Sequence, residues 1–162
     1  MVFGSTDSRP HFSMYGNPLS YVNEYKYLGV HVVSGKTFVT SHVKPLIKFR
    51  SSANTVLNVS HRPSEHILMK LLYAMCIPNL TYVADVIEYS TKQMQALNVA
   101  HNDSIRRIFG YNRWESVRYL RLSCNYPSLT DIFWKRSRIF HQRLPSLGNP
   151  TLRFLSELRE AD

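Results

Sequence analysis

The residues of this sequence with the clearest chemical potential are cationic. Lys44 and Lys48 stand four residues apart, and Ser51 and Thr55 continue the same helical face at steps of three and four. Ammonium groups and hydroxyls both donate hydrogen bonds, and this mixture suits contacts to phosphate oxygens. We therefore predict that the four side chains form one outward row that binds nucleic acid.

A second cationic group surrounds Gly110. Arg106 and Arg113 are predicted to contact phosphates, and Arg107 lies between them in the sequence. The alternative is that these charges belong to solvated helix faces, with Asp103 pairing with Arg107 across one helical turn. Basic residues continue along the chain with aromatic residues between them: Arg118, Tyr119, Arg121, Phe133, Trp134, Lys135, Arg136 and Arg138.

Sequence motifs of metal binding and catalysis are absent. His61 and His66 are five residues apart, which does not place them on one helix face, and the chain has no C-x-x-C, no G-x-S-x-G and no glycine-rich phosphate loop. Asp85 in "YVAD" lacks the adjacent carboxylate that a polymerase metal site needs. We predict no catalytic residue, no metal and no cofactor. His101 lies in an apolar stripe and is expected to be a core histidine with satisfied hydrogen bonds.

The charge of the chain points to a polyanion. Its 162 residues include 20 Lys and Arg against 11 Asp and Glu, which gives a net charge of +9. This balance favours nucleic acid as the partner over an anionic membrane surface, and the alternative is that the charge only aids solubility. Two cysteines, no signal-peptide pattern and no bilayer-length apolar stretch predict an intracellular protein with no membrane partner. Nucleus and cytoplasm are not distinguished.

The elements that must position these residues change character near residue 36. Residues 1–35 read as short strands, "MVF", "HFSMY" and "YKYLGVHVV", separated by turns. Because Val2 and Phe3 open the chain with no preceding element, we expect the missing strands of a larger sheet upstream. Gly29 interrupts the third strand, which indicates either a strand-end bulge or a close approach of the backbone to a ligand.

Helical periodicity begins at Thr37. A first long helix is predicted to bury an apolar arc, and a second runs from residue 63 or 64 to Pro78, where it kinks or breaks before resuming in residues 80–89. A third begins at Ser90, with Gln93 at capping-box spacing, and stops at Gly110. Further helices are predicted at residues 115–123, 128–144 and 151–159. The residues of the apolar arc are Phe38, Val39, Val43, Leu46, Ile47, Ala53, Val56 and Leu57.

The predicted fold is mostly α. A small N-terminal β region at residues 1–35 packs on a helical bundle at residues 36–144, and a linker and C-terminal helix occupy residues 145–162. The order of the signals resembles the C-terminal part of the reverse transcriptase of non-LTR (LINE-type) retrotransposons over residues 1–145. The stretches that carry the resemblance are "MVFG", "YKYLGVHV", "KTFVTSHV", "YAMCIPNLTY", "MQALNVAHNDSIRRIFG" and "LSCNYPSLTDIFWKRSRIF".

The resemblance implies the end of the palm followed by the thumb. Tyr27, Leu28 and Gly29 match the primer-grip hairpin of that family, where glycine lets the backbone approach a nucleic-acid strand. The following helices match the thumb, which lies against the template–primer duplex. The parent family is an RNA-directed DNA polymerase, but its fingers, most of its palm and its metal-binding aspartates precede "MVFG" and are missing here.

The chain alone is therefore expected to be inactive as a polymerase. It is expected to be a truncated fragment that binds RNA–DNA hybrid or duplex without sequence preference, and a separate palm and fingers chain is a second candidate partner. The alternative is a helical protein-interaction domain with no nucleic-acid role. Salt dependence discriminates the two, because counterion release affects phosphate binding far more than apolar docking.

Overall fold

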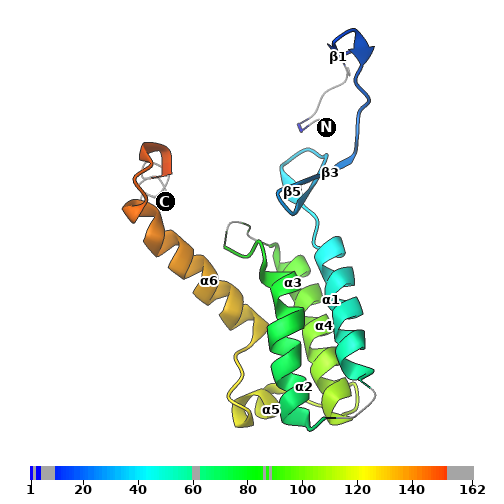
Figure 1. The fold of residues 1–162 in the computed structure, drawn as a ribbon, viewed down its shortest axis with the longest axis vertical. Coiled ribbons are helices and arrows are strands. Elements are labelled where there is room, and N and C mark those ends of the chain that lie inside the picture. Colours follow the sequence, from blue (N-terminus) through cyan, green and yellow to red (C-terminus); the bar gives the residue numbers. More distant parts are fainter. Residues whose placement is uncertain (2, 5–9, 60–62, 86, 88, 153–162) are drawn as a thin grey trace. The chain divides into compact units, whose positions relative to one another are not determined.

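The computed structural model describes residues 1, 3–4, 10–59, 63–85, 87 and 89–152. The chain divides into two compact units, Met1–Lys44 and Pro45–Asp162 (Figure 1). It is mostly helical, with two small antiparallel sheets, and this confirms a mostly-α fold with a small β region. Of the helices formed by the described residues, none is both long and apolar enough to cross a membrane.

The first unit contains both sheets. One pairs β1 with β2, and the other has the strand order β3-β4-β5. Phe3 adds an isolated parallel bridge to Gly35, whereas Val2 lies outside the described residues. The strands are β1 (Ser13–Met14), β2 (Asn17–Pro18), β3 (Glu24–Tyr27), β4 (Val30–Val33) and β5 (Val39–Thr40).

The three-stranded sheet has one aromatic face. Tyr25 pairs with Val32 and Tyr27 pairs with Val30. Because side chains alternate along a strand, these four residues share a face. Both tyrosines are nevertheless exposed, and Thr40 is the only buried residue among the described part of this unit. The first unit therefore has almost no core of its own.

The predicted start of the first long helix at Thr37 was wrong. Val39 and Thr40 form β5, which pairs with Val33 and Val32 of β4, and α1 (Val43–Leu57) begins only after it. Sheet hydrogen bonds outweigh the helical spacing of the apolar residues here, because propensity and pattern yield to tertiary pairing. The division between the two units accordingly lies at residues 44 and 45, and not at residue 35.

The predicted apolar arc of this helix was right only in part. Ala53 and Val56 are buried, but Val43 and Ile47 are exposed. Phe49, which the sequence pattern left outside the arc, is fully buried. The buried face of α1 is therefore rotated toward Phe49 relative to the predicted one.

The second unit is a bundle around a shared hydrophobic core. Long helices α1 and α4 and the segment from α2 to α3 (Figure 1) line this core. They supply most of its fully buried side chains. The elements after α1 are α2 (Glu65–Leu71), π-helix η1 (Leu72–Cys76), α3 (Ile77–Thr81), α4 (Thr91–Phe109), α5 (Arg118–Ser123), α6 (Leu129–Arg143) and the short 3-10 helix η2 (Leu144–Ser146).

The sequence predicted a kink or a break at Pro78, but no break occurs there: Pro78 lies in α3, directly after the π-helix η1. The helical run continues from α2 through η1 into α3 without a break. Proline lacks an N–H and clashes with the carbonyl four residues earlier, here Ala74, and a wider turn relieves that crowding. Beyond Thr81 the predicted resumption was wrong for residues 82–85, which form turns, and residues 86 and 88 lie outside the described part.

Local capping signals set both ends of α4. Ser90 Oγ accepts from the Gln93 N–H at 3.3 Å, and the Ser90 N–H donates to Gln93 Oε1 at 2.9 Å, which confirms the capping box. Gly110 closes the helix with φ +66°, as predicted. Ser128 and Asp131 form a second capping box at the start of α6. The helix predicted at residues 151–159 lies mostly outside the described residues.

Candidate nucleic-acid interface

One face of α1 carries the predicted phosphate-binding row. Lys44, Lys48, Ser51 and Thr55 are all exposed, and at 100° per residue they fall within an arc of about 60°. The helix contains no acidic residue, so nothing on α1 itself neutralises the two ammonium groups. Among the described residues, none of the recorded ion pairs includes Lys44 or Lys48.

Packing on the opposite side of α1 directs this row away from the core. Phe49, Ala53 and Val56 are buried, and they lie across the helix from the lysines. Two side-chain hydrogen bonds fix the flanks of the helix. Arg107 Nη1 of α4 donates to Asn54 Oδ1 at 2.7 Å, and Asn79 Nδ2 of α3 donates to Ser52 Oγ at 3.1 Å.

The four members of the row differ in what they can donate. The Thr55 hydroxyl already donates to the Ser51 carbonyl at 3.1 Å, so its proton is used within the helix. The Ser51 hydroxyl has no recorded hydrogen-bond partner in the described part of the chain. Lys44, Lys48 and Ser51 are therefore the three donors that a phosphate can reach, and Thr55 offers only lone pairs.

The Arg106 side chain is bonded to other residues of the protein and is mostly buried, so it is a poor candidate for contact with phosphate. Its Nη1 donates to Asp103 Oδ1 at 2.8 Å, its Nε donates to the Glu115 carbonyl at 2.9 Å, and 19% of the side chain is exposed. The predicted pairing of Asp103 with Arg107 was wrong, because Asp103 pairs with Arg106 and Arg107 reaches across to Asn54. Of the two arginines predicted to contact phosphate here, only Arg113 is exposed without a recorded partner among the described residues.

The later basic residues are partly neutralised. Arg136 donates to both carboxylate oxygens of Asp85, at 3.0 and 3.2 Å, and this bonding raises the pKa of Arg136. Asp85 of "YVAD" is therefore one half of an ion pair. The guanidinium of Arg138 lies 5.2 Å from the ring centroid of Trp134. Phe133, one of the aromatic residues between these basic positions, is buried.

Tyr27, Leu28 and Gly29 lie at the hairpin between β3 and β4. The strand pairing is continuous up to Tyr27 and Val30, so the strand-end bulge is ruled out. Leu28 and Gly29 are the two turn residues, with φ of +46° and +86°. This is the type I′ pattern, in which glycine is favoured because the left-handed region costs it nothing. The glycine inside an otherwise good strand sequence is thus a turn residue.

His101, Tyr73 and Arg121 form a cluster of polar side chains. His101 is fully buried as predicted, but neither of its ring nitrogens has a hydrogen-bond partner among the described residues. Burial, and then the charge of Arg121, lower the pKa of His101 to about 4. The Tyr73 ring meets that of His101 edge-on at 5.6 Å, and its hydroxyl donates to the Pro127 carbonyl at 2.7 Å. His101 is therefore a neutral core residue.

Comparisons with protein-family models, curated proteins and solved structures found no match. The resemblance to non-LTR reverse transcriptases therefore rests on the quoted sequence stretches.

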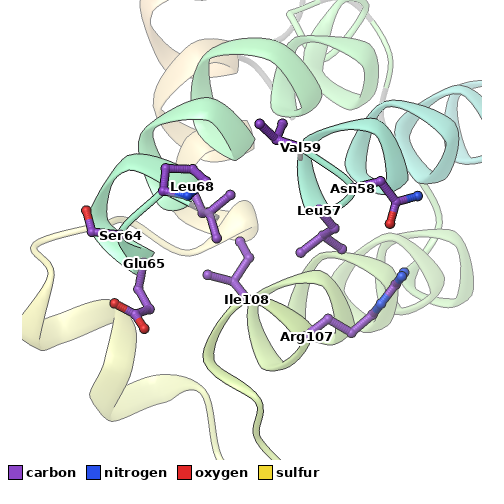
Figure 2. A pocket seen from close by; sticks show the side chains of 9 residues that line it. Leu57, Asn58, Val59, Ser64, Glu65, Leu68, Arg107 and Ile108 are labelled. Carbon is purple, nitrogen blue, oxygen red and sulfur yellow. The ribbon is translucent and has the colours of Figure 1, made fainter. Parts of the chain in front are cut away.

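A pocket of about 490 Å³ lies where α1, α2 and α4 end or begin (Figure 2). Leu57, Leu68 and Ile108 supply apolar lining, and Glu65 and Arg107 supply the charged groups. The described lining contains no histidine or cysteine. Across all described residues, no group of three or more His, Cys, Asp or Glu side chains is placed to hold a metal ion.

Trp114, the neighbour of Arg113, was not among the residues predicted from the sequence. Trp114 is 84% exposed, which is exceptional for the largest apolar side chain. A signal was present in the sequence, because Asn112 and Glu115 flank the pair at the spacing of a capping box.

Proposed function

We propose that this chain binds the phosphate backbone of nucleic-acid duplexes, including RNA–DNA hybrids, through the exposed face of α1. The observation that carries the proposal is the position of Lys44 and Lys48. They share one exposed helix face with Ser51, on a helix without a carboxylate, opposite a side that is packed into the core. A cationic row of this kind matches the spacing of phosphates along a groove edge.

The chemistry of the row favours binding without sequence preference. Lysine ammonium groups and a serine hydroxyl contact phosphates, whereas reading of base edges relies on planar bidentate groups such as Arg, Asn and Gln. A net charge of +9 adds long-range attraction to any polyanion. The resemblance to the thumb of non-LTR reverse transcriptases supports the same assignment, since the thumb lies beside the template–primer duplex.

The proposal does not include polymerase activity by this chain alone. The sequence has no two adjacent acidic residues, and adjacent carboxylates hold the metal ions of that reaction. Asp85 is tied to Arg136. We therefore propose a fragment corresponding to the palm end and thumb, which acts as a duplex-binding module.

The test is a charge reversal with a matched control. Lys44→Glu with Lys48→Glu removes two phosphate contacts, which should flatten the slope of log K against log salt by about 1.8. Lys70→Glu with Lys92→Glu changes the net charge equally, at exposed positions on α2 and α4. Fluorescence anisotropy on a blunt duplex and on an RNA–DNA hybrid, at several salt concentrations, measures both. If the two double variants show equal slopes of log K against log salt, α1 is not part of the nucleic-acid interface.

A second candidate function is protein binding. The aromatic face of the first unit favours it, because Tyr25 and Tyr27 are 58% and 64% exposed on an otherwise apolar sheet face. A separate palm and fingers chain is the partner that the resemblance implies. Binding that is insensitive to salt and lost with Tyr25→Ser and Tyr27→Ser would favour this function over duplex binding.

A further inference from the structure

A rigid turn follows the end of α4. In residues 112–115 the Glu115 N–H donates to the Asn112 carbonyl at 3.1 Å, and the Asn112 N–H donates to Glu115 Oε2 at 2.9 Å. The Asn112 amide also donates to Glu115 Oε1 at 3.3 Å. Arg106 Nε donates to the Glu115 carbonyl at 2.9 Å and thereby ties the turn to α4. The backbone of the turn is therefore held in place before any ligand arrives.

The two central positions of this turn are Arg113 and Trp114. Both are exposed, and 84% of Trp114 is accessible to solvent. No ring or cation is recorded against the Trp114 indole among the described residues, whereas the guanidinium of Arg138 lies 5.2 Å from the ring of Trp134, the only other tryptophan. The Trp114 indole is thus largely exposed to solvent, on a backbone that needs no further ordering to bind.

Aromatic and cationic side chains also flank the turn. Tyr111 precedes it and is 44% exposed, and Arg118 and Tyr119 at the start of α5 are exposed. Glu115, the only carboxylate of the turn, is engaged by Asn112. Proteins hold unpaired nucleotides by stacking bases on aromatic rings and by placing cations against the neighbouring phosphates. Bases inside a duplex are already stacked and do not offer a free face.

We propose that residues 112–115 form a stacking site for an unpaired nucleotide. The indole of Trp114 takes the base, and the guanidinium of Arg113 takes the adjacent phosphate. This inference rests on the proposed nucleic-acid function and adds to it a contact with single-stranded nucleic acid. The phosphate row of α1 does not supply such a contact, because it contains no aromatic residue.

Single-tryptophan variants allow the fluorescence of Trp114 to be measured apart from that of Trp134. Trp134→Phe leaves Trp114 as the single tryptophan, and Trp114→Phe leaves Trp134 as its matched control. Titration with a ten-nucleotide oligo(dT) at low salt should quench the emission of Trp114 and leave that of Trp134 unchanged. Trp114→Ala should weaken oligo(dT) binding by a factor on the order of ten, since a single base–aromatic stack is lost. Blunt duplex binding should be unaffected.

The outcomes separate this inference from the proposed function. If the chain binds duplex but oligo(dT) leaves Trp114 emission unchanged, the stacking site is wrong and the α1 interface stands. Equal quenching of Trp114 by oligo(dT) and by blunt duplex would also overturn it, and so would an unchanged oligo(dT) affinity in Trp114→Ala. If neither ligand binds at low salt, both proposals fail. A thermal melt of Trp114→Ala checks that the exposed substitution leaves the fold intact.

Discussion

The two units of this chain differ in how they bury apolar side chains. The second unit, Pro45–Asp162, is the helical unit, and it encloses a core that includes Phe49, Met69 and Leu97, each fully buried. The first unit, Met1–Lys44, is the β unit. Among its described residues only Thr40 is buried, although Phe3, Phe12 and Phe38 all belong to it. Apolar burial is the main stabilising contribution to folding, so most of the free energy of unfolding must come from the helical unit.

This difference bears on where function can be placed. The Lys44–Lys48 row and the turn of residues 112–115 both lie on helices, or on a turn tied to a helix, and so have fixed geometry before binding. The β3–β4 hairpin belongs to a small open sheet, and sheets of this size need packing on one face for independent stability. Duplex and single-strand contacts are therefore expected to survive changes in the β unit that do not alter α1.

A matched pair of phenylalanines tests the comparison most strongly. Phe49→Ala removes a fully buried ring from the helical core and should lower the free energy of unfolding by about 3–5 kcal/mol. Phe38→Ala removes a ring that is 68% exposed, and should change the same quantity by less than about 0.5 kcal/mol. Urea denaturation followed by circular dichroism at the helical band measures both. Similar losses for the two variants would show that the β unit contributes to the stability of the helices.

The pH dependence of stability comes next in size. Buried His101 has its pKa lowered to about 4 from an ordinary value of 6.5. Below pH 6.5 the unfolded chain binds a proton there that the folded chain does not bind until about pH 4. His101 therefore does not reduce the free energy of unfolding above pH 6.5. As the pH falls from 6.5 to about 4, the free energy of unfolding drops by about 3 kcal/mol in total.

The measurement is urea denaturation at pH values between 7 and 5, a range in which few carboxylates titrate. The fall in stability should disappear in His101→Phe and persist in His66→Gln, because His66 is an exposed histidine on α2. A fall that persists in His101→Phe would assign it to another group. In that case the cluster of His101, Tyr73 and Arg121 would not be the cause of the loss of stability at low pH.

Local signals account for what the sequence predicted correctly. The capping box of Ser90 and Gln93, the stop at Gly110 and the outward row on α1 each depend on residues within one or two turns. The errors came from partners that lie in other elements. Val39 and Thr40 form a strand because they pair with β4. The Arg106 side chain donates to the Glu115 carbonyl in the turn that follows α4, and so it is not free for phosphate. Phe49 was missed because the buried side of α1 is set by the helices that pack on it.

The smallest expected effect lies in the hairpin turn of the β unit. Leu28 has φ +46°, a left-handed conformation that costs an L-residue with a bulky side chain about 1–2 kcal/mol. Asparagine tolerates this conformation and is the preferred residue before glycine in a type I′ turn. Leu28→Asn should therefore stabilise the β3–β4 hairpin by about 0.5–1 kcal/mol. Slower hydrogen exchange of the β4 amides, with unchanged exchange in α4, would be the result expected.

The same variant decides whether the strained leucine has a role. The Leu28 side chain is 76% exposed and makes no contribution to a core, so its presence in an unfavourable conformation needs a reason. If Leu28 contacts the nucleic-acid strand, as the resemblance to a primer grip implies, Leu28→Asn should weaken duplex binding while it stabilises the hairpin. Unchanged anisotropy on the same duplex, with the hairpin stabilised, would assign duplex binding to α1 alone. Faster hydrogen exchange of the β4 amides in Leu28→Asn would contradict the type I′ assignment, because asparagine at this position of a type I′ turn relieves strain and does not add it.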